Sequence, residues 1–179
     1  MRRVLGTMAA VIFAVGLGFS GTGEVAQAAA EAPGDARFEF LKGLSGTWSG
    51  VPGEDGSPGI TFEFNVTAGG SAVEVREMAG TPMEMVTLYH LDGSDLVATH
   101  YCMLGNRPVL NAADRLKDGA LAFECSGTPG GSASHDEQHV HGWTLALAED
   151  GTLHIDVKIA AEGETAESPS FVLSRQAAH

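Results

Sequence analysis

Residues 83–108, MEMVTLYHLDGSDLVATHYCMLGNRP, contain the pattern from which the fold of this chain can be predicted. Two runs rich in valine, threonine, leucine and tyrosine flank the turn signal Asp92-Gly93-Ser94-Asp95. This arrangement is typical of a β-hairpin. The second run ends in the polar cluster His100-Tyr101-Cys102, followed by Gly105-Asn106. We expect the hairpin to supply part of the wall of a binding pocket.

Alternation of apolar and polar side chains extends over most of the remaining chain. The clearest segments carry their apolar side chains at every second position: Ile60, Phe62, Phe64 and Val66 in one, and Leu153, Ile155, Val157 and Ile159 in another. A period of two indicates strands with one buried face. Short turns separate the strands, and no helical crossover pattern intervenes, so we predict an all-β, antiparallel up-and-down meander of about 8–10 strands.

Such a meander must pack as a sandwich or close on itself. We favour a closed barrel, because closure removes the exposed strand edges. A sandwich is the alternative, since strand pairing cannot be read from one sequence. Residues 36–44 place Phe40, Leu41 and Leu44 at helical spacing, with Gly43 near the end. They predict a short N-terminal helix ahead of the first strand.

Residues 1–28 have the pattern of a secretory signal peptide. A basic start is followed by an apolar run, and Ala26-Gln27-Ala28 fits the small-x-small cleavage rule. We expect export, periplasmic or secreted, after cleavage near Ala28. A flexible segment at residues 29–35 and a single barrel domain at residues 36–179 would follow. A transmembrane anchor is less favoured, because the apolar run is short and interrupted by glycines.

The charge balance restricts the partners. The chain has 10 basic and 23 acidic side chains, for a formal net charge of −13. Cleavage would remove two basic residues and one acidic residue, which leaves 8 and 22 and a charge of −14 in 151 residues. An acidic surface repels phosphate backbones and anionic lipids. We therefore expect a small-molecule partner rather than nucleic acid or a membrane surface, and the oligomeric state is left open.

Cys102 and Cys125 are the only cysteines. In an exported protein they can form a disulfide. It would close a loop of about two dozen residues and contribute roughly 3 kcal/mol. The alternative is two separate thiols, with Cys102 in the pocket.

The late strand carries two histidines. His139, His141 and Trp143 share the parity of Leu145 and Leu147. If that face lines the barrel, both imidazoles point inward. Ionising them there without a partner would be costly, so they would serve as neutral hydrogen-bonding or metal-ligating groups.

A second pair of polar residues lies on the first hairpin. His100 and Cys102 are two apart, and Asn106 follows them. His90 would share their face only if the turn had a different length and the strand register changed by one residue. We therefore do not include His90 among the predicted site residues. The predicted ligand-binding residues are His100, Cys102, Asn106, His139, His141 and Trp143.

The same side chains suggest a metal site. His100, Cys102, His139 and His141 offer the nitrogen and sulfur ligands that zinc, copper or iron accept. They can meet one ion only if their strands are neighbours or face each other. The favoured alternative is a set of hydrogen-bonded histidines in a mixed polar pocket. The sequence has no nucleophile elbow, phosphate-binding loop or dinucleotide fingerprint, which favours binding over catalysis.

The two ends of the barrel domain carry a further signal. Leu44, Gly46-Thr47-Trp48 and the late Arg175 give the chain a pattern that resembles the calycin superfamily, the lipocalins and their relatives. In that superfamily a short helix leads into a G-x-W strand, whose tryptophan stacks beneath an arginine from the last strand. The resemblance implies structural roles for Trp48 and Arg175.

Two narrower resemblances bear on function. Residues 89–108 and His139-Val140-His141 are similar to bacterial lipocalin-like proteins of unknown function, the DUF1579-like group. That group implies no particular reaction. The opening at residues 44–48 is also similar to the haem-binding nitrobindins, which implies haem as a cofactor candidate.

Three hypotheses follow from these patterns. The leading one is an exported β-barrel that binds a small molecule in its interior. The second is metal- or haem-dependent binding or catalysis at the His/Cys cluster. The third is a structural or interaction module of the cell envelope, in which the polar cluster is merely part of the core.

Overall fold

The computed structural model describes residues 34–51, 59–125, 137–162 and 164–177. The expected signal peptide and most of the expected flexible segment lie outside these residues. Within the described residues, no helix has both the length and the apolar character needed to cross a membrane.

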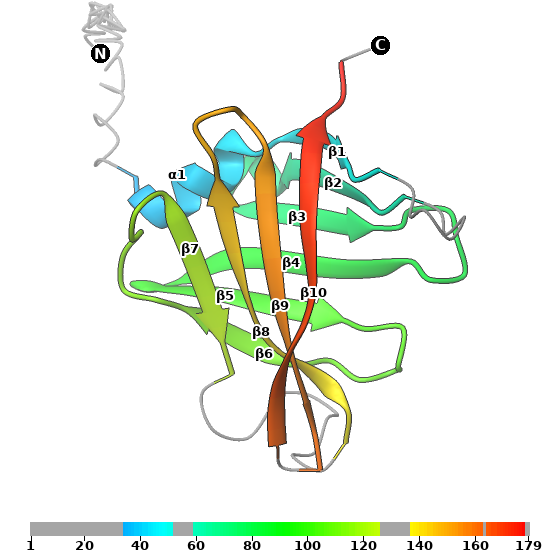
Figure 1. Ribbon diagram of the computed structural model, residues 1–179. Helices are drawn as coiled ribbons and strands as arrows, with labels where there is room; N and C mark the ends of the chain where they lie inside the picture. The colour runs from blue at the N-terminus through cyan, green and yellow to red at the C-terminus, as the bar shows by residue number, and fades with distance from the viewer. Residues whose placement is uncertain (1–33, 52–58, 126–136, 163, 178–179) are drawn as a thin grey trace, which may run out of the picture. The chain divides into compact units, whose positions relative to one another are not determined.

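The described strands form a closed antiparallel barrel, and one short α-helix precedes them (Figure 1). Each strand pairs with its neighbours in sequence, and the first pairs with the last. The helix is α1 (Ala36–Gly43), and a three-residue 3₁₀ turn, η1 (Ala68–Gly70), joins the second and third strands. The strands are β1 (Gly46–Ser49), β2 (Thr61–Thr67), β3 (Ala72–Glu77), β4 (Met85–Asp92), β5 (Asp95–Tyr101), β6 (Val109–Ala112), β7 (Ala120–Glu124), β8 (His139–Leu147), β9 (Leu153–Ala161) and β10 (Glu164–Arg175).

This architecture confirms the predicted up-and-down meander with a short helix, and it excludes the sandwich alternative. The barrel closes where Trp48 of β1 pairs with Arg175 of β10 and Ser49 pairs with Ser174. On its other side, β1 pairs with β2. Closure supplies each strand with two partners and leaves no open sheet edge.

Helix α1 is fixed by a charged cap. The Asp35 carboxylate accepts hydrogen bonds from the backbone N–H groups of Arg37 and Phe38, at 2.9 and 3.4 Å. The Arg37 side chain bonds to Asp35 and holds the pKa of that carboxyl at about 2. Arg37 also donates to the carbonyls of Ser94 (2.7 Å) and Ala113 (3.2 Å). The helix is therefore tied to the β4–β5 turn and to the chain after β6.

The buried side of α1 differs by one residue from the expectation. Phe38 and Leu41 are buried together with Leu44, whereas Phe40 only packs against the edge of the core. The helix therefore contributes apolar side chains to the core.

Trp48 and Arg175 join the helix end to the first and last strands. The Trp48 indole N–H donates to the Leu44 carbonyl at 2.8 Å, and the ring is almost fully buried. The Arg175 guanidinium lies 4.3 Å from the centre of that ring and donates to the carbonyls of Gly43 and Ser45. This contact places a cation on the aromatic face and satisfies carbonyls at the end of the helix.

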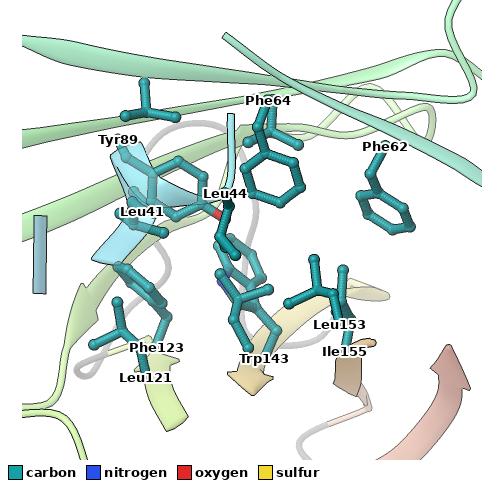
Figure 2. Packing of buried hydrophobic residues seen from close by; sticks show 14 of the residues in the cluster. Leu41, Leu44, Phe62, Phe64, Tyr89, Leu121, Phe123, Trp143, Leu153 and Ile155 are labelled. Carbon is teal, nitrogen blue, oxygen red and sulfur yellow. The ribbon is translucent and has the colours of Figure 1, made fainter. Parts of the chain in front are cut away.

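The core includes a group of aromatic rings. Tyr89 and Phe123 have ring centres 5.2 Å apart, and Phe123 and Trp143 are 5.6 Å apart. Figure 2 shows these rings in the same cluster as Leu41 and Leu44 from the helix end. Edge-to-face and tilted contacts of this kind add to the stabilisation from burial.

We expect Arg175→Met to lower the free energy of unfolding by about 1–2 kcal/mol. Methionine keeps an apolar stem over Trp48 but loses the cation and its hydrogen bonds to two carbonyls. Urea denaturation would measure the change, with the exposed Arg115→Met as the matched control. Equal losses in the two variants would contradict the proposed role of the contact.

Candidate functional site

The barrel contains a cavity of about 260 Å³. Most of its lining is apolar, with Phe64, Val75 and Val157 among the lining side chains. Met103 and Leu104 also line it and are 51% and 55% exposed, so they mark its open end. The cavity therefore offers an apolar interior that is reached past the chain that follows β5.

Three polar side chains from neighbouring strands form a network at the cavity wall. The Thr87 hydroxyl of β4 lies 3.3 Å from Glu77 Oε1 of β3 and 2.8 Å from His100 Nδ1 of β5. Thr87 and His100 are directly opposite in the β4–β5 register, which brings their side chains together. Glu77 and His100 line the cavity.

Burial keeps this network close to neutral. It raises the pKa of Glu77 from 4.5 to about 7 and lowers the pKa of His100 from 6.5 to about 4. Between these values both groups are predominantly uncharged. The approach of Glu77 Oε1 to His100 Nδ1, at 3.6 Å, is therefore a contact between polar groups rather than an ion pair.

Two polar atoms in the lining residues lack a hydrogen-bond partner among the described residues. They are His100 Nε2 and Trp143 Nε1, and both are fully buried. The two rings meet edge to face, with centres 5.8 Å apart. Burial raises the pKa of the neighbouring Tyr89 well above its ordinary value, and Glu77 adds to the rise, whereas the approach of the Trp143 N–H lowers it. This approach does not meet the distance and angle of a hydrogen bond, so Trp143 Nε1 is left unsatisfied. A buried, unsatisfied polar atom costs about 1–3 kcal/mol, and a bound ligand can remove that cost.

A second group of chemically active side chains consists of Cys125, His139 and His141. Their ligand atoms all lie within 4.8 Å of one another, so the group could hold a metal ion. His139 is fully buried, and its Nδ1 lies 2.7 Å from the Glu137 carbonyl. Its Nε2 lies 3.4 Å from His141 Nδ1. Burial raises the pKa of the Cys125 thiol to about 11.

A β-bulge in β8 separates this group from the cavity. Val140 pairs with Ile159 of β9, but the register shifts before Gly142, so that Trp143 pairs with Val157. His141 is thus the extra residue. Val140 and Trp143, three positions apart, both line the cavity.

The structure places the predicted ligand-binding residues in two different groups. His100, Cys102 and Trp143 line the cavity, but His139, His141 and Asn106 are not among its lining residues. Alternation through β8 is interrupted, because the extra residue shifts the parity before Trp143. The two histidines are instead buried or half-buried beside Cys125. Asn106 donates its side-chain amide to the Gln138 carbonyl at 2.8 Å.

The structure also places the predicted metal ligands apart from one another. His100 and Cys102 belong to the cavity, whereas His139 and His141 are grouped with Cys125, so the four predicted ligands are divided between two places. Their strands are not adjacent in the barrel, since β6 and β7 lie between β5 and β8.

The two cysteines are free thiols in the structure, in line with the alternative to a disulfide. The Cys102 N–H bonds to the Asn106 carbonyl at 3.1 Å in the turn after β5. The Cys125 N–H bonds to the His141 carbonyl at 2.9 Å in the extension of β7. Each cysteine is thus fixed in a different part of the sheet.

Sequence reasoning missed Glu77 and Thr87 as site residues and considered Cys125 only as a disulfide partner of Cys102. Glu77 continues the parity of the buried Val73 and Val75, which would have signalled a carboxylate on the inner face. Thr87 gives no such signal, because threonine is common in strands on either face.

Comparisons with known proteins do not assign a family. No protein-family model matches the chain, and no curated protein matches it. The proposed function therefore rests on the geometry of the cavity with its polar network and of the group formed by Cys125, His139 and His141.

We expect Glu77→Gln to change how stability depends on pH. The folded state favours neutral Glu77, so stability falls as pH rises from about 4.5 to about 7, by up to roughly 3 kcal/mol. Glutamine removes this loss, and the variant should gain stability over the wild type at pH 8 but not at pH 4.5. Urea denaturation at several pH values measures this, with the exposed Glu149→Gln as control. Parallel pH curves for wild type and Glu77→Gln would rule out a buried neutral carboxyl.

Proposed function

We propose that the chain is a β-barrel binding protein whose cavity takes a small, neutral and mainly apolar molecule with one hydroxyl group. The observation that carries this proposal is an apolar cavity whose wall contains two buried polar atoms without partners, His100 Nε2 and Trp143 Nε1. Pockets of this kind use apolar surface for affinity and a few polar groups for orientation.

The size and lining of the cavity define the apolar part of the ligand. A volume of about 260 Å³ lies just below the range of about 300–1,000 Å³ that is typical for drug-sized ligands. Aromatic and branched side chains from β2, β8 and β9, such as Phe64, Leu145 and Ile155, supply the contact surface. A compact ring system or a short chain fits these limits.

The polar network favours a hydroxyl group on the ligand. If Thr87 donates its single hydrogen to Glu77, it accepts from His100 Nδ1, and His100 Nε2 is then an acceptor. If protonated Glu77 donates to Thr87, Thr87 donates to Nδ1, and Nε2 becomes a donor. Trp143 Nε1 is a donor in both cases. A hydroxyl group, which both donates and accepts, satisfies either arrangement.

The charges at the cavity favour a neutral ligand. Its lining residues include no lysine or arginine to balance an anion, and Glu77 is the one carboxylate among them. Burying an unpaired charge is costly. The strongly acidic composition of the chain also disfavours anionic ligands.

Haem fits the cavity poorly. His100 would be the residue to hold the iron, since its Nε2 has no hydrogen-bond partner among the described residues and His100 lines the cavity. However, the macrocycle is larger than drug-sized ligands, and the volume of about 260 Å³ is below the range for those. The cavity likewise favours binding over a purely structural role in the cell envelope, for which a filled interior would suffice.

Calorimetric titration with menthol, menthane and menthylamine tests the proposal. The wild type should bind the alcohol about 5–10-fold more tightly than the hydrocarbon, because about 1 kcal/mol of hydrogen bonding is added. His100→Phe should lose much of this preference and keep only the part that comes from Trp143 Nε1, whereas the exposed His90→Phe should keep all of it. Tryptophan fluorescence would report the same event from Trp143, and Trp143→Phe should remove most of the signal because Trp48 lies outside the lining.

Absence of binding to all three compounds would overturn the cavity proposal. Tightest binding of the amine would show that Glu77 takes a cation instead. A preference for the alcohol that persists undiminished in His100→Phe would overturn the assigned anchor.

We also propose that the chain works outside the cytoplasm, in a fold of the calycin type. Support for export comes from the basic start, the apolar run and Ala26-Gln27-Ala28. Support for the calycin type comes from the contact between Trp48 and Arg175 in a closed meander. Mass spectrometry of the protein recovered from the periplasm or medium of an expressing bacterium should give a chain that begins at Ala29. Recovery of an intact chain from the cytoplasm alone would contradict export.

A further inference from the structure

We propose that Cys125, His139 and His141 form a binding site for a thiophilic transition-metal cation such as Zn²⁺, separate from the ligand cavity. The site does not depend on the proposed ligand binding, because none of the three residues lines the cavity as the structure describes it. It also differs from the four-residue set predicted from the sequence, since Cys125 takes the place of Cys102 and His100.

The orientation of His139 suits a metal ligand. A carbonyl oxygen only accepts hydrogen bonds, so the 2.7 Å contact between His139 Nδ1 and the Glu137 carbonyl requires a hydrogen on Nδ1. In the neutral ring, the lone pair is then on Nε2. Metal-ligating histidines are commonly oriented by such a bond from the other ring nitrogen to a carbonyl. In this chain the lone pair is on the atom that faces His141.

The spacing of the two imidazoles matches the requirement of a tetrahedral ion. Two nitrogens that are each about 2.0–2.1 Å from Zn²⁺ lie about 3.3 Å apart. His139 Nε2 and His141 Nδ1 are separated by 3.4 Å. The Cys125 sulfur lies within 4.8 Å of a ring nitrogen of each histidine, against about 3.6 Å for bound ligands. Small rotations of the side chains would complete the three-ligand set.

The backbone fixes the three residues relative to one another. The Cys125 N–H donates to the His141 carbonyl at 2.9 Å, which joins the extension of β7 to the bulge of β8. Gly142 lets these strands come close, because a Cβ at this position would lie 2.7 Å from the Phe123 carbonyl oxygen. Bulges often reorient a side chain next to a functional site. Ligands that are held on paired strands lose little conformational freedom when an ion binds.

The ligand types determine the class of ion. One thiolate and two imidazoles suit Zn²⁺ or copper, whereas Ca²⁺ and Mg²⁺ require oxygen ligands. Three protein ligands leave a fourth tetrahedral position for water or another group.

The test uses the full-length chain without a histidine tag, stripped with a chelator and kept under a thiol-free reductant. Titration with Zn²⁺ should give one bound ion per chain, and Co²⁺ should give a thiolate-to-cobalt charge-transfer band. Cys125→Ala should abolish the band, and the half-buried His141→Ala should weaken Zn²⁺ binding by at least about tenfold. Circular dichroism would verify that both variants are folded.

Two matched controls use the same residue types elsewhere in the barrel. Cys102→Ala removes the other thiol, and His90→Ala removes an exposed histidine, so both should bind Zn²⁺ and Co²⁺ as the wild type does. Failure of the wild type to bind Zn²⁺ would overturn the proposal, as would a band that persists in Cys125→Ala or disappears in Cys102→Ala. If a variant is unfolded, the wild-type Co²⁺ spectrum decides, since a spectrum without thiolate bands overturns the site.

Discussion

The extra residue in β8 determines which side chains of this strand line the cavity and which lie beside Cys125. Side chains of a strand alternate between its two faces, and one inserted residue reverses the alternation beyond it. In β8 that residue is His141, so Val140 and Trp143 both line the cavity, whereas His139 and His141 lie beside Cys125. Gly142 makes the bulge compatible with the close approach of β7. A single backbone irregularity thus separates the β8 residues of the cavity wall from the group formed by Cys125, His139 and His141.

The interior of the barrel departs from an apolar lining at one place. Glu77, Thr87 and His100 come from three consecutive strands, and their side chains meet because cross-strand neighbours share a face. Burial shifts the pKa of Glu77 upward and that of His100 downward, so both groups remain mostly neutral. The network therefore avoids the cost of burying a charge. Local departures from the rules of core packing are expected at functional sites rather than elsewhere.

The alternation of side chains and the short turns are local features of the sequence. They are the same in an open meander and in a closed barrel, so the strands could be predicted from the sequence alone. The helix and the meander followed from local patterns of this kind, and closure was favoured because it removes exposed strand edges. The structure places His100 and Trp143 in the cavity lining, where the sequence pattern predicted them. The bulge was not predictable, because the string His139-Val140-His141-Gly142-Trp143 shows unbroken alternation and the register shift exists only relative to β9. The grouping of Cys125 with the two histidines was not predicted either, because it depends on the pairing of β7 with β8, which one sequence does not reveal.

The seam between β1 and β10 joins the two most distant parts of the barrel. Arg175 reaches the Gly43 carbonyl across 132 positions of the chain, and Gln176 reaches Ser49 across 127. Every other strand pair can form between sequence neighbours as the chain leaves the ribosome. The barrel itself can be completed only when its final residues have been synthesised, and until then β1 lacks one of its two neighbours. The bond from the Trp48 indole to the Leu44 carbonyl spans only four residues, so it can hold β1 against the end of the helix before β10 has been made.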